Sequence, residues 1–166
     1  PLNVRTALTA IAALQRIGWQ LPLSAIQHGF ANVKPQSGLR GRMDQLGSNP
    51  LILADVGHNE GGFRFVIREL AEIPKEKLHF VIGVVSDKDL SKMMDLFPRE
   101  AIYYFAKPDI PRGKSASELQ SYFASYGCNG NVYASVSDAL QAAKAAATPQ
   151  DLIFVGGSTF VVAEVI

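Results

Sequence analysis

Apolar residues recur every three or four positions over the first thirty residues, which is the period of an amphipathic helix. The spacing predicts a first helix over residues 4–17, with Asn3 as its cap and Gly18 at its end. A second, shorter helix is predicted over residues 23–30, capped by Ser24. The chain therefore opens with two consecutive helices and no strand between them.

The helical period stops at residues 34–38, Lys-Pro-Gln-Ser-Gly, which are turn-forming residues. After this segment, short apolar runs alternate with stretches of helical spacing. We therefore predict a domain boundary that separates residues 1–37 from residues 38–166. Because the sequence begins at Pro1 without a methionine, we expect residues 1–37 to be the end of a preceding domain.

Beyond the boundary, strands and helices alternate with short connections. This order predicts an α/β fold, a mostly parallel sheet flanked by helices, with right-handed crossovers. The first two strands form a hairpin, so the first becomes an antiparallel edge strand. The penultimate helix is rich in alanine and is predicted to be capped by Ser137. The predicted strands cover residues 41–46, 51–56, 78–85, 101–106, 132–133 and 152–155, and the predicted helices cover residues 63–72, 91–97, 115–126, 137–147 and 160–165.

The predicted hairpin turns through residues 47–50, Gly-Ser-Asn-Pro. If Leu46 pairs with Leu51, the antiparallel register places Arg42 opposite Asp55. A cross-strand ion pair is the ordinary structural interpretation of such an arrangement. A functional interpretation has to come from the residues around the pair.

Polar residues follow four of the strands that enter the predicted parallel sheet. Because the carboxyl ends of parallel strands meet at one edge, we expect these residues to converge on a ligand site. The cations among them, together with Arg42 and backbone amides at helix starts, favour an anion such as a carboxylate or a phosphate. The converging residues are Asp55, His58, Asn59, Asp87, Lys88, Asp89, Lys107, Asp109, Arg112, Gly156, Gly157 and Ser158.

The composition is that of an ordinary soluble globular chain, with 48% hydrophobic and 19% charged residues. A net charge of +1 provides no basic surface for nucleic acid, and no block of like charges suggests a membrane partner. The single cysteine, Cys128, fits a reducing compartment. There is neither a signal peptide nor an apolar run near the ~20 residues of a membrane span, so we expect a cytoplasmic protein. We also expect a monomer.

Several common motifs are absent. No Gly-x-Gly-x-x-Gly follows a strand, and the phosphate-loop-like sequence at residues 113–115 has Pro108 where its first glycine should stand. His28, His58 and His79 are isolated from one another, so no metal ligand set is predicted. Ser158 lacks the Gly-x-Ser-x-Gly surroundings of a nucleophile. This chain alone should not hydrolyse ATP.

Four elements together resemble the carboxyl-terminal domain of folylpolyglutamate synthase/dihydrofolate synthase, in the Mur ligase superfamily. They are Gly41-Arg42 before the hairpin, Asp55-Val56-Gly57-His58-Asn59, Asp87-Lys88-Asp89, and the closing Gly157-Ser158. The Asp-x-x-His-Asn element belongs to the superfamily, and the other three favour the folate branch. The similarity spans nearly the whole chain, and residues 1–37 resemble the last helices of that enzyme's central ATPase domain. The resemblance implies that residues 38–166 form a Rossmann-like domain.

The activity implied by the resemblance is that of an ATP-dependent amide ligase. The family activates a folate or dihydropteroate carboxylate as an acyl phosphate, which the amine of L-glutamate attacks, with Mg²⁺ as the metal. The ATPase domain would hold the metal and most of the ATP, so this stretch should be inactive alone and carry no catalytic residue of its own. By position, the implied ATP contacts are Arg42 and Asp55, the implied glutamate contacts are His58 and Ser158, and further candidate contacts are Asn59 and Lys88.

The sequence also departs from the family pattern. Glu60 stands where a proline commonly follows His-Asn, although a glutamate at a helix start suits the helix dipole. Structural roles compete for other residues: Ser158 can be a helix cap, Asp87 and Asp89 can be caps or solvated loop residues, and Arg112 can be a surface charge. Two other functions stay open, namely a sibling ligase of peptidoglycan precursors and a stand-alone anion-binding module without catalysis.

Overall fold

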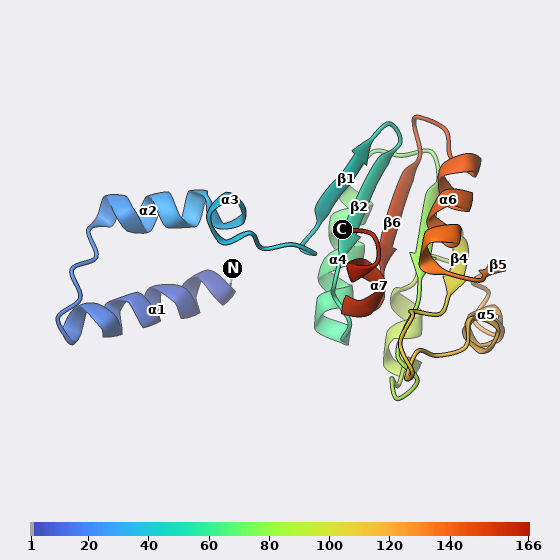
Figure 1. The fold of residues 1–166 in the computed structure, drawn as a ribbon, viewed down its shortest axis with the longest axis horizontal. Helices are drawn as coiled ribbons and strands as arrows, with labels where there is room; N and C mark the ends of the chain where they lie inside the picture. Colours follow the sequence, from blue (N-terminus) through green and yellow to red (C-terminus); the bar gives the residue numbers. More distant parts are fainter. Residues whose placement is uncertain (1) are drawn as a thin grey trace. The chain divides into compact units, whose positions relative to one another are not determined.

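The computed structural model describes residues 2–166, which divide into two compact units (Figure 1). The first unit ends at Leu39, and the second runs from Arg40 to Ile166. No helix among the described residues is long and apolar enough to cross a membrane.

The first unit consists of three helices, α1 (Leu2–Arg16), α2 (Leu23–Ala31) and α3 (Val33–Ser37). Two predicted caps are wrong, because Asn3 lies inside α1 and Ser24 lies inside α2, which follows Pro22 without a side-chain cap. The helix α3 was predicted as a turn. A proline in the first turn of a helix loses no hydrogen bond, which is why Pro35 is compatible with α3.

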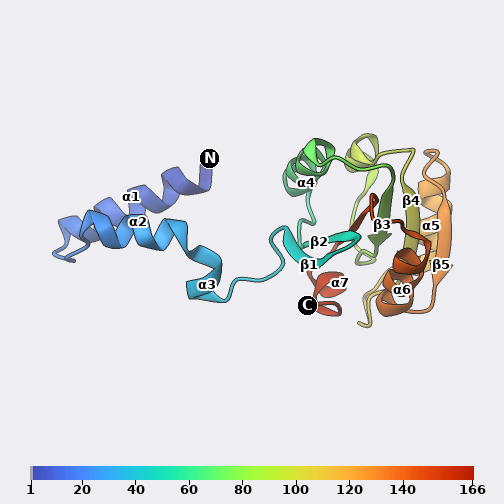
Figure 2. The same cartoon turned by 90° about the horizontal axis from the view of Figure 1, so that it is seen from above.

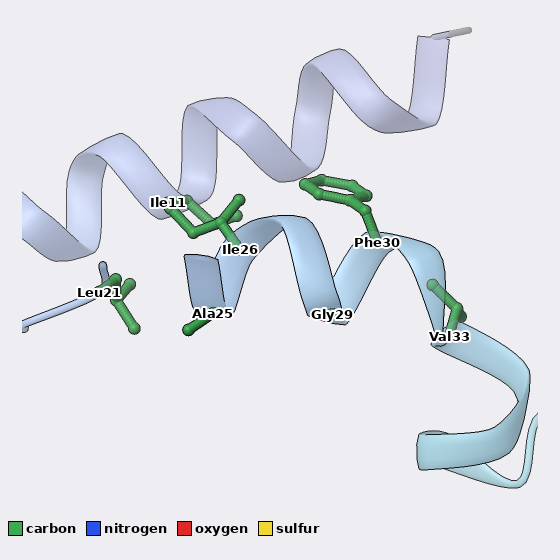
Figure 3. A pocket seen from close by; sticks show the side chains of 7 residues that line it. All are labelled: Ile11, Leu21, Ala25, Ile26, Gly29, Phe30 and Val33. Atoms are coloured by element: carbon green, nitrogen blue, oxygen red, sulfur yellow. The ribbon is translucent and has the colours of Figure 1, made fainter. Parts of the chain in front are cut away.

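Apolar side chains of the first unit lie between α1 and α2, among them Ile11, Ile26 and Phe30 (Figure 3). They line a cavity of about 320 Å³ together with Leu21, Ala25, Gly29 and Val33. No residue of α2 is buried in the described chain. The first unit therefore has an apolar groove but no core of its own.

The second unit is built on one six-stranded sheet with the strand order β1-β2-β6-β3-β4-β5. All neighbouring strands are parallel except β1 and β2, which form the hairpin at one edge (Figure 1). The predicted α/β class, with an antiparallel edge strand, is therefore confirmed. The strands are β1 (Asp44–Ser48), β2 (Leu51–Asp55), β3 (Leu78–Ile82), β4 (Ile102–Ala106), β5 (Gly130–Tyr133) and β6 (Leu152–Gly156).

The predicted register of the hairpin is wrong. Ser48 pairs with Leu51, so the turn is two residues shorter than predicted, and Leu46 is an extra residue between the paired Gln45 and Gly47. This bulge shifts the remainder of the strand, and Asp44 pairs with Ala54. Arg42 consequently precedes the strand and does not face Asp55 within the ladder.

Helices cover both faces of the sheet (Figure 2). One core packs α4 (Glu60–Glu72), the 3₁₀ helix η1 (Ser91–Leu96) and α5 (Ala116–Ala124) against one face. A second core packs α6 (Val136–Ala146) and α7 (Thr159–Ala163) against the other. Successive strand residues point to opposite faces, which is why β3 and β6 are buried at every position.

Aromatic rings fill the first of these cores. Phe80 of β3 lies at the centre, with ring centroids 5.4 Å from Tyr103 and 4.9 Å from Phe154. Edge-to-face contacts continue from Phe97 to Phe123 at 4.8 Å. This packing joins β3, β4 and β6, which are three of the four strands whose loops form the candidate site.

Two helix starts are set by side-chain caps that the prediction did not place correctly. Ser135, not Ser137, caps α6, because its hydroxyl accepts a hydrogen bond from the amide of Asp138 at 3.0 Å. The helix α4 begins at Glu60, three residues earlier than predicted, and Asn59 is its cap. Both differences follow from side-chain caps in the preceding turn, which periodicity alone does not locate.

Candidate functional site

A cavity of about 490 Å³ lies at the edge of the sheet where the parallel strands end. Its lining comes from the loops after β2, β3, β4 and β6, so segments distant in the sequence meet there. Six of the residues predicted to converge line this cavity: His58, Asp87, Lys88, Arg112, Gly157 and Ser158. Three lining residues were not predicted: Val85, Thr159 and Phe160. Lys107, Asp109 and Asp89 do not line it.

Lys88 connects three of these loops. Its ammonium group donates a hydrogen bond to the backbone oxygen of His58 and lies 3.5 Å from the backbone oxygen of Gly157. The same nitrogen stands 5.5 Å from the ring centre of Phe63, which adds a cation–π contact. Burial lowers the pKa of Lys88 to about 8, because the charged form loses part of its hydration. An anion bound beside this ammonium would restore the lost solvation.

His58 is exposed at the end of the β2 loop. Its Nδ1 lies 3.1 Å from the backbone oxygen of Val56. Because a carbonyl oxygen can only accept, this bond requires the proton on Nδ1, which leaves Nε2 of the neutral ring as an acceptor. The imidazole is thus oriented by the turn that carries it.

Ser158 is buried, with 4% of its surface exposed, and it begins α7. Its hydroxyl oxygen accepts a hydrogen bond from the amide of Phe160 at 3.2 Å, so the predicted capping role is confirmed. The hydroxyl proton stays available for a ligand in the cavity. Gly157 before it has a φ of +101°, and an added Cβ would lie 2.6 Å from the backbone oxygen of Gly83. Only glycine fits this close turn.

Both carboxylate oxygens of Asp55 accept hydrogen bonds from backbone amides. One accepts from the amide of Gly57 at 2.6 Å and the other from the amide of Met43 at 2.9 Å. Met43 has a φ of +46°, an unusual value for a residue with a side chain. The buried carboxylate therefore fixes the backbone beside Arg42, and it does not form the predicted pair with the Arg42 side chain.

Arg42 and Asn59 lie outside the cavity lining. Arg42 is exposed, and among residues 2–166 no ion pair to its guanidinium is found. Asn59 is the cap of α4, because its side-chain oxygen accepts from the amide of Gly62 at 2.9 Å. The structure therefore brings His58, Lys88 and Ser158 together, and it leaves Arg42 beside the loop that Asp55 holds.

The described residues show no arrangement suited to a metal ion. Within the part of the chain that the structure describes, no group of three or more His, Cys, Asp or Glu side chains is arranged to hold a metal ion. Asp89 accepts a hydrogen bond from the amide of Ser91 at 2.9 Å. Hydrogen bonding from the Ser91 side chain, followed by this backbone bond, holds the pKa of Asp89 below its usual value.

The fold and the cavity define a class of protein: an α/β domain with a partly polar cavity at the carboxyl ends of its parallel strands. A family model, described as the glutamate ligase domain of Mur ligases, matches residues 41–159. The chain belongs to this Mur ligase family.

Similar proteins come from the folate branch of the family. The dihydrofolate synthase/folylpolyglutamate synthase of Escherichia coli K12 is 30% identical over 161 residues, which are 96% of this chain and 36% of that protein. The structure of E. coli FolC in complex with DHPP and ADP superimposes with a TM-score of 0.80 at 31% identity, covering 95% of this chain and 36% of that one.

A further solved structure is a bifunctional folylpolyglutamate synthase/dihydrofolate synthase with Mn, AMPPNP and L-glutamate bound. It has a TM-score of 0.78 and 30% identity, and it covers 95% of this chain and 37% of that one. The chain thus spans little more than a third of the length of these relatives.

Proposed function

We propose that this chain is the carboxyl-terminal part of a longer ATP-dependent ligase that adds L-glutamate to folate or dihydropteroate. Family membership supports the proposal, as do relatives whose structures hold DHPP with ADP or AMPPNP with L-glutamate. The observation that carries it is a single cavity whose lining includes both Lys88 and Ser158. These are donors suited to a carboxylate.

The reaction proceeds in two steps. A carboxylate oxygen of the folate substrate attacks the terminal phosphorus of ATP, and ADP leaves. The amine nitrogen of glutamate then attacks the carbonyl carbon of the acyl phosphate, phosphate leaves, and the nitrogen loses a proton to give the amide. The protein's contribution is mainly positioning and electrostatic stabilisation of the phosphoryl charge.

Glutamate binding is assigned to His58, Ser158 and Lys88. Ser158 donates its hydroxyl proton to a carboxylate of glutamate while its oxygen still caps α7. Lys88 supplies the compensating positive charge, and its bonds to the His58 and Gly157 backbone hold the two loops around the ligand. His58 offers Nε2 as an acceptor toward the same cavity.

Contacts to ATP and its transferred phosphoryl group are assigned to Arg42 and Asp55. The exposed guanidinium of Arg42 suits the spreading charge of a transferred phosphoryl group. Asp55 acts by holding the backbone of the neighbouring Met43, which sets the direction of the Arg42 side chain. Asn59 contributes by capping α4.

Mg²⁺ and most of the ATP are assigned to the rest of the longer protein. The described residues offer no cluster that fits a metal ion. ATP, a divalent metal, the folate substrate and the ATPase domain are thus the expected partners of residues 38–166.

Residues 1–37 are assigned to the last helices of that ATPase domain. Large apolar side chains of this unit are exposed, among them Leu8, Trp19 and Leu23, at 47%, 59% and 68%. We assign the preceding part of the same chain as the partner that covers them. The assignment explains why this unit has a groove without a core.

The test uses the full-length protein with Mg²⁺-ATP, L-glutamate and either dihydropteroate or a reduced folate. We expect release of ADP and phosphate and a product heavier by one glutamyl residue in mass spectrometry. Residues 1–166 alone should form none. Use of another amino acid in place of glutamate, or no glutamate-dependent ADP release with either pterin, contradicts the proposal.

A further inference from the structure

The proposed ATP contact, Arg42, is the middle residue of a turn that leads into β1. The residues on either side of it have left-handed backbones, with φ of +73° at Gly41 and +46° at Met43. A residue with a side chain rarely adopts such an angle, so the surrounding structure must hold Met43 in place. Arg42 itself is exposed, and its guanidinium forms no ion pair in the described part of the chain.

Three hydrogen bonds to backbone groups fix this turn at both of its ends. The amide of Gly41 donates to the side-chain carboxylate of Asp44, and the Gly41 carbonyl oxygen accepts from the amide of Val56 at 2.9 Å. The amide of Met43 donates to the carboxylate of Asp55 at 2.9 Å. Each outer residue of the turn is therefore bound through its amide to a different carboxylate, one from β1 and one from β2.

Asp44 is the first residue of β1, and it is buried, with 7% of its surface exposed. The oxygen that accepts from the Gly41 amide also accepts from Nε of Arg40 at 3.2 Å. Because the Arg40 side chain is 57% exposed, this ion pair contributes little, and the bond to the buried Gly41 amide is the important one. An added Cβ at Gly41 would lie 2.5 Å from Cγ1 of Val56, so the turn packs directly against the residue that follows β2.

We propose that Asp44 is a positioning residue, which sets the direction of the Arg42 side chain from one side as Asp55 does from the other. Fixing the backbone of both neighbours removes part of the conformational freedom of the arginine before the phosphoryl group arrives. A charge that is already in place stabilises the transition state without reorganisation during the reaction. The inference rests on the proposed ATP contact of Arg42 and deepens it. In this role Asp44 contacts no substrate and acts through the backbone of Gly41.

Two substitutions of Asp44 test this role in the full-length protein with Mg²⁺-ATP, L-glutamate and the folate substrate. Asp44→Ala leaves the buried Gly41 amide without its acceptor and should lower kcat about tenfold. Asp44→Asn keeps an oxygen that can accept from the amide, and its weaker, neutral bond should lower kcat only about threefold. The KM for glutamate should stay within about twofold of the wild type in both variants, because glutamate binding is assigned to other residues.

A double-mutant cycle with Arg42→Ala separates positioning from general support of the fold. If Asp44 acts through Arg42, Asp44→Ala should change kcat by less than about twofold once the guanidinium is absent. Asp151→Asn is the matched control, because Asp151 is also a buried carboxylate that accepts backbone amides, at the opposite end of the sheet. The control should change kcat by less than about twofold with and without Arg42, even where it lowers the unfolding temperature.

Two results would overturn the inference while the ligase function stands: an unchanged kcat in the folded Asp44 variants, or an equal loss of kcat from them with and without Arg42. Thermal unfolding verifies which variants are folded at the assay temperature. If Asp44→Ala is not, Asp44→Asn decides by the same criterion, since its loss of kcat must vanish in the Arg42→Ala background. Wild-type protein without glutamate-dependent ADP release overturns the proposed function instead.

Discussion

Lys88 should make anion binding depend on pH between 7 and 9. Burial lowers its pKa to about 8, so the ammonium form falls from roughly 90% at pH 7 to roughly 10% at pH 9. A bound carboxylate needs the charged form. If the complex keeps Lys88 protonated, the affinity for an anion falls about tenfold across this range.

The assay is inhibition of the full-length ligase by glutarate, whose own carboxylates are fully ionised above pH 7. The inhibition constant should rise about tenfold from pH 7 to pH 9 in the wild type. In Lys88→Arg it should stay flat, because a guanidinium keeps its proton, and in Lys88→Met it should be weak and flat. A flat wild-type profile, or the same rise in both variants, would refute the reasoning.

The same shift has a consequence for stability. The folded pKa of Lys88 lies below its unfolded value, so the folded state binds fewer protons between pH 8 and 10.5. The free energy of unfolding therefore gains a positive slope with pH in that window. Anion binding and folding thus respond to pH in opposite directions, because the ligand favours the charged ammonium and burial disfavours it.

Three other substitutions test the site and its support. Arg42→Ala should lower turnover at least tenfold with unchanged unfolding temperature, whereas Arg40→Ala, beside it and paired with Asp44 at 3.2 Å, should not; steady-state ATP kinetics would distinguish them. Gly157→Ala should destabilise the protein by about 1–3 kcal/mol in urea denaturation, because its φ is +101° and the new Cβ would meet the Gly83 oxygen; wild-type stability would refute this. Asp151→Ala should cost about 2–4 kcal/mol in the same assay, because the amides of Lys77 and Thr148 lose a buried acceptor, and a loss below about 0.5 kcal/mol would count against it.

Some of the site could be predicted from the sequence because parallel strands all end at one edge. His58, Lys88 and Ser158 were expected together on that ground, and the structure places them around one cavity. Arg112 and Asp87 were expected at the same edge, with a surface charge and a cap as competing interpretations. Their loops are joined by the bridge between Val85 and Gly113, which connects residues 28 positions apart.

The hairpin shows why register could not be predicted in the same way. The pairing of Leu46 with Leu51 assumed a four-residue turn, but Ser48 pairs with Leu51, and the bulge at Leu46 then changes the partner of every residue before it. Asp55 was therefore expected to meet the side chain of Arg42. It instead accepts backbone amides from Met43 and Gly57, a use of a carboxylate that leaves no periodic signal.

The sequence by itself determined the alternation of strands and helices, the parallel sheet and the edge at which polar loops gather, because hydrophobic period and turn chemistry are local properties. Only the tertiary structure decided which loops touch, where the bulge falls and which charges face the cavity. Those features depend on backbone bonds and side-chain packing between residues far apart in the chain, and no local pattern encodes them.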